Sequence, residues 1–185
     1  MSINSLENSN LEFDIMNELK ILSYNMGQNK NLVQGPGGNT SIKIGHKIFI
    51  KASGKRLNQA LNENIFIPLD LDHVLETFEN HNKYQQNLEL KPLIKTNLKP
   101  SIETFLHALM PFKVVLHSHP IDIIAATAME GFRKNFETIL KDIEWDIISY
   151  QRPGYPLAES IKQSISNNKS NVLFLANHGL IVGAD

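Results

Sequence analysis

The sequence predicts a layered domain of the α/β or α+β type, in which helices cover a central sheet. Two observations carry this prediction. Apolar residues recur at helical spacing near the N-terminus, and several short β-branched runs further along are bounded by glycine, proline or asparagine. The length of 185 residues suits one domain, residues 1–185, which is long enough to bury most of its apolar surface.

The first half of the chain changes from helical to sheet periodicity. The N-terminal apolar stripe predicts an amphipathic helix that ends near Gly27, and a later alternation of polar and apolar residues is typical of a hairpin. Pro68 should stop the short strand that precedes it. The expected elements are a helix over 11–26, a hairpin over 41–52, a strand over 65–67 and a polar surface excursion over 79–97.

The second half alternates helices and strands. Pro100 and Ser101 should open a helix that Pro111 closes, since proline and serine favour helix starts and proline cannot continue a helix. The last strand ends the chain with no helix to cover its apolar face, so we expect a missing C-terminal segment. The expected elements are helices over 100–110, 121–130 and 156–166, and strands over 113–119, 145–150, 171–176 and 180–182, with a turn at 177–179.

Composition narrows the classes of function. A formal net charge of -1 and a pI near 6.7 give no electrostatic reason to expect nucleic acid or an anionic membrane as a partner. The absence of cysteine excludes disulfides and thiolate metal sites, so any metal must be held by His, Asp or Glu. We find no signal peptide pattern and no apolar stretch of membrane-spanning length, and therefore expect a cytoplasmic location.

Three histidines in two short motifs are the most informative feature. His117 and His119 lie in VVLHSHP, and His178 lies in LFLANHGLIVG. Residues i and i+2 of a strand point to the same face, so the first two imidazoles can converge, and a third from another strand end would complete a site with one open position. Catalytic zinc uses that arrangement, and we expect Zn²⁺ here. The alternative is that one or two of these rings are hydrogen-bonded core residues.

Two glycine-rich turns and one carboxylate suggest further chemistry. The turns at 35–41 (GPGGNTS) and 52–55 (ASGK) have backbone N–H groups that can approach an anion, and together they could clamp one phosphate. Neither has the spacing of a nucleotide phosphate loop, and each taken alone is more typical of an ordinary turn. Glu103 could reach the open metal position as a general acid/base, or could simply stabilise the start of a helix.

The remaining candidate groups receive less weight. His107, four residues after Glu103, is more plausibly structural than a ligand. Asp142 and Asp146 are more plausibly a solvated face than ligands of a zinc hydrolase. No role is assigned to the histidines in polar or turn contexts, His46, His73 and His81.

The ordered motifs GGNTS, ASG, S-x-E-x-x-x-H, VVLHSHP and LANHGLIVG resemble the class II aldolase/adducin family over Gly35 to Gly183. The resemblance implies a three-layer α/β/α domain with a central, mainly antiparallel sheet, assembled as a homotetramer around a four-fold axis. It also implies that Glu103 is the acid/base and that His117, His119 and His178 bind zinc. The phosphate pocket matches Gly38, Asn39, Ser53, Gly54 and Ser101.

Two family features have no match in the chain. Ile102 replaces the second serine that usually precedes the glutamate, and no position matches the catalytic tyrosine of a neighbouring subunit. The segments GGNTS, IKASG and PSIETFLHALMP particularly resemble aldolase domains fused to a dehydrogenase. The chain is therefore expected to be one part of a larger polypeptide or a stand-alone relative of such a part.

The resemblance implies a zinc-dependent aldolase that cleaves a ketose phosphate, or a related ketose, to dihydroxyacetone phosphate and an aldehyde through a metal-stabilised enediolate. Two alternatives use the same residues: a pentulose-phosphate 4-epimerase and a thiosugar-phosphate dehydratase. An alternative of another class is a non-catalytic, adducin-like assembly module. The three catalytic interpretations leave the particular ketose or aldehyde open.

Overall fold

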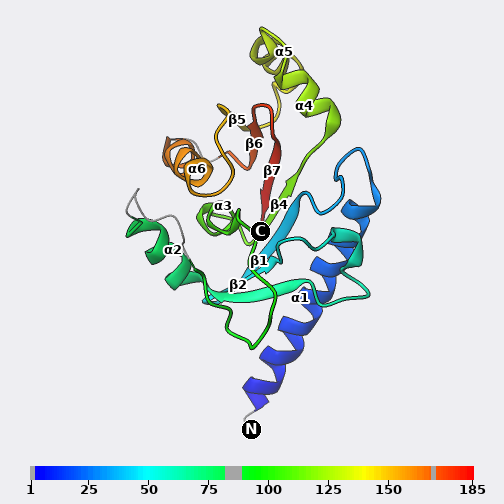
Figure 1. Ribbon diagram of the computed structural model, residues 1–185, viewed down its shortest axis with the longest axis vertical. Helices are drawn as coiled ribbons and strands as arrows, with labels where there is room; N and C mark the ends of the chain where they lie inside the picture. Colours follow the sequence, from blue (N-terminus) through cyan, green and yellow to red (C-terminus); the bar gives the residue numbers. More distant parts are fainter. Residues whose placement is uncertain (1–2, 82–88, 168–169) are drawn as a thin grey trace.

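The computed structural model describes residues 3–81, 89–167 and 170–185. Helices and strands follow one another along the chain as drawn in Figure 1. The helices in this part are α1 (Ile3–Gln28), α2 (Leu71–Glu79), α3 (Thr104–Leu109), α4 (Ile121–Thr127), α5 (Phe132–Ile139) and α6 (Tyr155–Asn167), with a 3-10 turn η1 at Leu57–Gln59. The strands are β1 (Asn39–Ile44), β2 (Lys47–Lys51), β3 (Phe66–Asp70), β4 (Val114–Ser118), β5 (Trp145–Ile148), β6 (Val172–Leu175) and β7 (Gly179–Ala184).

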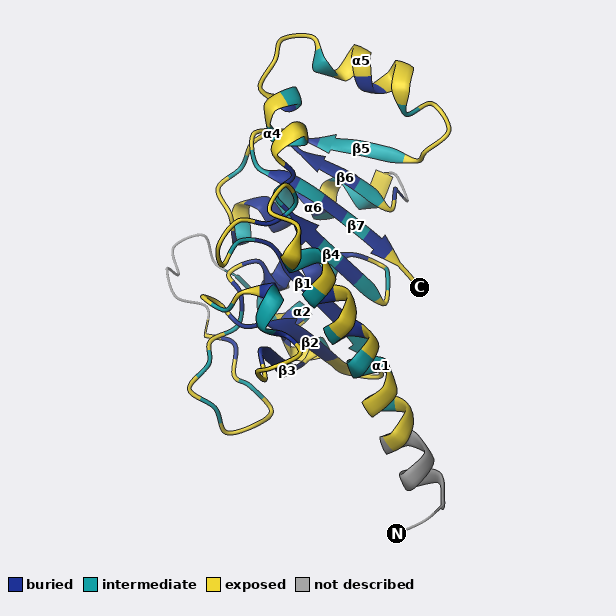
Figure 2. Ribbon diagram, turned by 90° about the vertical axis from the view of Figure 1, so that its right-hand side faces the viewer, coloured by how far each residue is buried: buried dark blue, intermediate teal, exposed yellow. Residues whose placement is uncertain are grey.

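The strands form one seven-stranded sheet in the order β3-β2-β1-β4-β7-β6-β5. Every neighbouring pair is antiparallel except β5 and β6, which run parallel. This arrangement confirms the expected central, mainly antiparallel sheet. It also brings β4 and β7, which are far apart in the sequence, next to each other at the middle of the sheet (Figure 2).

Helices cover both faces of the sheet, which confirms the layered α/β prediction. On one face α1 packs on the β1–β3 end through a smaller apolar cluster that includes Leu19, Ile42 and Phe66. On the other face α2, α3 and α6 contribute to a larger cluster with the sheet, in which Leu106 and Ile161 are fully buried. Figure 2 shows the buried strands between these helices. No helix in the described ranges has the length and apolar character needed to cross a membrane.

Several element boundaries differ from the sequence-based expectations. β3 continues through Pro68, because β3 is an edge strand and the missing N–H of proline is tolerated there. The helix expected over 100–110 begins only at Thr104, and Ser101 instead accepts a hydrogen bond from the N–H of Glu103 in the preceding turn. The segment expected as a helix over 121–130 ends at Thr127, and a second helix, α5, follows Gly131.

Two further differences concern helices that the patterns did not fully reveal. Helix α1 starts at Ile3, well before the apolar stripe that predicted 11–26. Helix α2 was not anticipated. Asp70 caps it by accepting a hydrogen bond from the N–H of His73. Of the expected surface excursion over 79–97, residues 82–88 lie outside the described residues.

Candidate metal centre

The three histidines of the two motifs meet at the end of β4. His117 belongs to β4, His119 follows that strand directly, and His178 lies in the turn between β6 and β7. Since β4 pairs antiparallel with β7, with Ser118 opposite Leu180, the turn before β7 is brought beside the end of β4. The ligand atoms of the three rings all lie within 4.8 Å of one another. The structure thus brings together the residues that the spacing predicted as ligands.

The backbone sets which nitrogen of His117 faces the cluster. Nδ1 of His117 lies 3.0 Å from the carbonyl oxygen of Leu180. A carbonyl only accepts, so Nδ1–H donates and the lone pair of Nε2 is left for the cluster. Nε2 lies 3.0 Å from Nε2 of His119, close to the roughly 3.3 Å that two ligands about 2.0 Å from one tetrahedral zinc would have between them. Hydrogen-bonding the far nitrogen in this way orients ligands in metal sites.

Burial keeps these imidazoles neutral. Desolvation lowers the pKa of His117 to about 3, assisted by repulsion from His119, and lowers the pKa of His178 to about 4. Burial also lowers the pKa of His119, against the opposing effect of the Glu103 charge. Neutral imidazole is the form that binds metals, so near pH 7 the cluster needs no deprotonation before it binds an ion.

Glu103 directs one carboxylate oxygen at the histidines. Its Oε1 lies 3.4 Å from Nε2 of His117 and 3.4 Å from Nε2 of His178. This buried oxygen has no hydrogen-bond partner among the described residues, whereas Oε2 accepts a 2.7 Å hydrogen bond from Nδ2 of Asn39. A buried polar atom without a partner is costly. Three neutral imidazoles beside an unpaired carboxylate oxygen therefore fit a divalent cation such as zinc.

Two glycines allow other segments to approach the end of β4 closely. A Cβ on Gly179 would lie 2.2 Å from the carbonyl oxygen of Ser118, which no packing tolerates. Gly38 has a φ of +66°, and a Cβ there would lie 2.9 Å from the carbonyl oxygen of His117. Glycine is needed at both positions so that β7 and the GPGG turn can flank the histidines.

The residues predicted to bind phosphate lie around Glu103. Asn39 stands opposite His117 in the β1–β4 ladder, and its side-chain amide is engaged by Glu103 and His107. The N–H of Ser53 donates to the carbonyl of Lys99, which holds the Ser53–Gly54 turn near Ser101. Ser101 in turn accepts from the N–H of Glu103.

Lys51 joins the two glycine-rich turns, a role that the sequence analysis missed. Its ammonium donates to the carbonyl of Pro36 at 3.0 Å and to the carbonyl of Lys55 at 2.5 Å. Burial lowers the pKa of Lys51 to about 8, and the charge of Glu103 opposes this shift. The only sequence signal is a lysine at the end of the strand KIFIK, whose preceding three residues are apolar.

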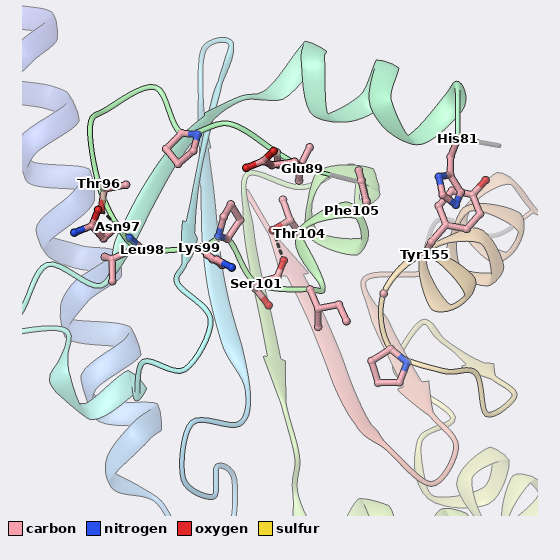
Figure 3. A pocket seen from close by; sticks show the side chains of 16 residues that line it. His81, Glu89, Thr96, Asn97, Leu98, Lys99, Ser101, Thr104, Phe105 and Tyr155 are labelled. Atoms are coloured by element: carbon pink, nitrogen blue, oxygen red, sulfur yellow. Dashed lines mark hydrogen bonds between the residues drawn. The ribbon is translucent and has the colours of Figure 1, made fainter. Parts of the chain in front are cut away.

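A cavity of about 800 Å³ adjoins this region without including the metal ligands (Figure 3). Ser101 and Thr104 form part of its wall, with His81 and Tyr155 at its far end. None of the three clustered histidines lines it. Ile102, which replaces the family's second serine, is 66% exposed and gives the wall an apolar surface where a hydroxyl was expected.

Comparison with known proteins establishes the family. The model of the class II aldolase and adducin N-terminal domain matches residues 21–185, and the chain belongs to this family. A curated relative, the uncharacterized oxidoreductase YuxG of Bacillus subtilis (strain 168), is 29% identical over 179 residues, which cover 89% of this chain. The chain spans only about a quarter (26%) of that relative's length.

Solved structures agree with this assignment. The N-terminal class II aldolase domain of a conserved protein from Thermoplasma acidophilum superposes with a TM-score of 0.76 at 27% identity, covering 91% of this chain and 83% of that one. A sugar-phosphate aldolase from Thermotoga maritima has a TM-score of 0.72 at 14% identity, covering 94% and 85%, and so shares the fold. The predicted family and fold class are therefore confirmed.

Proposed function

We propose that this chain is the catalytic unit of a zinc-dependent aldolase, a carbon–carbon lyase that reversibly cleaves a ketose phosphate to dihydroxyacetone phosphate and an aldehyde. One observation carries the proposal: three neutral imidazoles, one buried and two partly buried, converge with a buried carboxylate oxygen that has no partner in the described chain. Membership of the class II aldolase and adducin family supports the same reaction class.

The residues divide the chemistry between them. His117, His119 and His178 would hold the metal, which when bound supplies a Lewis acid for the negative charge that develops on substrate oxygens as the carbon–carbon bond breaks. Glu103 is placed to carry a proton on Oε1 to the substrate carbon that loses its bond, because this oxygen faces the cluster while Oε2 is held by Asn39.

The glycine-rich turns would hold the substrate phosphate. We assign this role to Gly38, Asn39, Ser53, Gly54 and Ser101, with the backbone N–H groups of the two glycines and the hydroxyls of the two serines as the proposed donors. Lys51 supports this proposal because it tethers both turns and adds positive charge beneath them. We further propose a homotetramer, which light scattering of the purified chain would test.

Metal content is the first experimental test. The protein, purified without added metal, should contain about one zinc per chain by mass spectrometry, and His117→Gln should contain none. His46→Gln serves as a matched control, since it removes an exposed histidine outside the cluster. Failure of the wild-type protein to take up zinc from a supplemented buffer would refute the aldolase and leave an assembly module as the better explanation.

Product analysis then identifies the reaction. Release of dihydroxyacetone phosphate from a panel of ketose 1-phosphates, followed with a coupled reductase, is the expected outcome. Conversion of ribulose 5-phosphate to a second pentulose phosphate without free dihydroxyacetone phosphate would instead identify an epimerase. Glu103→Gln should keep its zinc and lose about 10²- to 10⁴-fold in kcat, the usual contribution of a general acid/base. Near-normal turnover in that variant would remove Glu103 from the mechanism.

A further inference from the structure

A buried chain of side chains leads away from Glu103. Oε2 of Glu103 accepts from Nδ2 of Asn39 at 2.7 Å, and Oδ1 of Asn39 contacts Nε2 of His107. Nδ1 of His107 lies 2.8 Å from Oγ of Ser41. The side chains of His107 and Ser41 are fully buried, and Asn39 and Glu103 are 4% and 6% exposed.

The spacing of two secondary-structure elements produces this chain. Asn39 and Ser41 are residues i and i+2 of β1 and so point to the same face, roughly 6.7 Å apart along the strand. Glu103 and His107 are separated by four residues at the start of α3, a rise of about 6 Å on one helix face. The two pairs therefore match in length and interleave across the interface between β1 and α3.

The donors and acceptors permit one assignment when Glu103 is ionised. A carboxylate only accepts, so Asn39 must offer its Nδ2 to Glu103 and turn its Oδ1 toward His107. Nε2 of His107 must then carry a hydrogen, which leaves a lone pair on Nδ1 for the hydroxyl of Ser41. Burial lowers the pKa of His107 well below its usual value, so the ring is neutral and cannot donate from both nitrogens.

We propose that His107 is a positioning residue for the acid/base: its Nε2–H sets the amide orientation of Asn39, which holds Oε2 of Glu103 and keeps Oε1 directed at the histidine cluster. This inference rests on the proposed function for the role of Glu103. The hydrogen-bond chain itself does not depend on any substrate. His107 does not contact the cluster through a hydrogen bond, and it acts on Glu103 only through Asn39.

The tautomer of His107 provides a direct test that needs neither substrate nor activity. Long-range ¹H–¹⁵N correlation spectra of uniformly labelled, zinc-loaded protein distinguish the two ring nitrogens, and His107→Gln assigns the signals. We expect a neutral ring with hydrogen on Nε2. Hydrogen on Nδ1 would mean that Nε2 accepts from Asn39 and that the amide is turned the other way, which would overturn the proposal.

A pair of substitutions separates positioning from packing. Glutamine places an amide nitrogen near the position of Nε2 and can still donate to Asn39, whereas the shorter asparagine can reach only the Ser41 side. In the aldolase assay, His107→Asn should lose about 10- to 100-fold in kcat with zinc content retained and KM changed less than threefold. The variant His107→Gln should instead keep a kcat within about fivefold of the wild type. Equal losses in both variants would show that His107 only fills space.

A second variant and a second readout keep the test decisive. If His107→Asn does not fold, Asn39→Asp cuts the same chain, because the new carboxylate can accept from His107 but cannot donate to Glu103. Its kcat should fall at least tenfold, and wild-type turnover would overturn the proposal.

If the wild-type protein cleaves no ketose phosphate, the proposed function fails. The positioning role is then tested by the visible spectrum of the Co²⁺-loaded protein. Glu103→Gln should change this spectrum relative to the wild type, and Asn39→Asp should change it in the same way. A spectrum of Asn39→Asp identical to that of the wild type would refute the positioning role.

Discussion

Acidification should destabilise the metal-free protein through its buried histidines. Burial lowers the pKa of His117 to about 3 and that of His178 to about 4, and it lowers the pKa of His107 well below the usual 6.5. Below pH 6.5 the unfolded chain therefore binds protons that the folded chain does not bind, and the free energy of unfolding falls. The stability is fully present above pH 6.5 and is lost as the pH falls toward the folded-state pKa values.

The magnitude follows from the same shifts. Each unit of pKa difference corresponds to about 1.36 kcal/mol, and pH 5 lies about 1.5 units below the unfolded-state value. His117 and His178, whose pKa values lie at about 3 and about 4, then each contribute a loss of about 2 kcal/mol between pH 8 and pH 5, or about 4 kcal/mol together, and His107 adds a loss of the same sign. Domains commonly have a total stability of about 5–15 kcal/mol, so the metal-free protein should lose a large part of its stability by pH 5.

Urea denaturation in the presence of a chelator, at intervals from pH 8 to pH 5, measures this loss. His117→Gln should show a pH-dependent loss smaller by about 2 kcal/mol, because it removes one of the three groups. Zinc at a hundredfold excess over its Kd should add about 2.7 kcal/mol at a given pH. An unfolding free energy that stays constant from pH 8 to pH 5.5, or an unchanged pH dependence in His117→Gln, would refute the reasoning.

Three further predictions follow from the geometry. Gly179→Ala should prevent zinc uptake and lower the free energy of unfolding by more than about 3 kcal/mol, since its Cβ would meet the Ser118 carbonyl at 2.2 Å. Gly45→Ala is the control: with open space around it, this variant should lose only about 1–2 kcal/mol in the same unfolding assay and should still bind zinc. Lys51→Met should keep zinc but bind inorganic phosphate about tenfold more weakly by calorimetry, whereas Lys47→Met, on the same strand but exposed, should bind phosphate as the wild type does. Equal phosphate affinities of Lys51→Met and the wild type would show that Lys51 does not contribute to the phosphate site. Zinc binding near pH 7, measured in two buffers with different protonation enthalpies, should release less than one proton per ion, and release of two or three would contradict the neutral state of the cluster.

Local patterns in the sequence predicted most of the elements but not all their limits. The helix of residues 11–26 and the hairpin of residues 41–52 were recognisable because their periodicity depends on neighbouring residues. The continuation of β3 through Pro68 was not, because whether a proline is tolerated depends on which strand lies at the sheet edge. Strand order is a property of the whole sheet and has no local signal.

In the candidate site, too, the sequence predicted some features and the tertiary structure was needed for others. The sequence alone determined that cysteine plays no part, that three histidines lie at strand ends and that a glutamate precedes them, and these motifs sufficed to predict the family and the fold, both of which are confirmed. The assignment of the individual ligands and of the acid/base stays a prediction. Its geometric basis, the convergence of the rings within 4.8 Å, required the pairing of β4 with β7.

The tertiary structure alone supplied the environment of these groups. Three features depend on contacts between separate segments of the chain. They are the unpaired oxygen of Glu103, the tautomer that Leu180 imposes on His117, and the link that Lys51 makes between the two glycine-rich turns. The shift of each pKa likewise depends on how much of the chain packs around the group. Residue type and spacing specify which chemical groups are available, whereas desolvation and hydrogen bonding, which set their protonation and orientation, arise only when distant segments pack together.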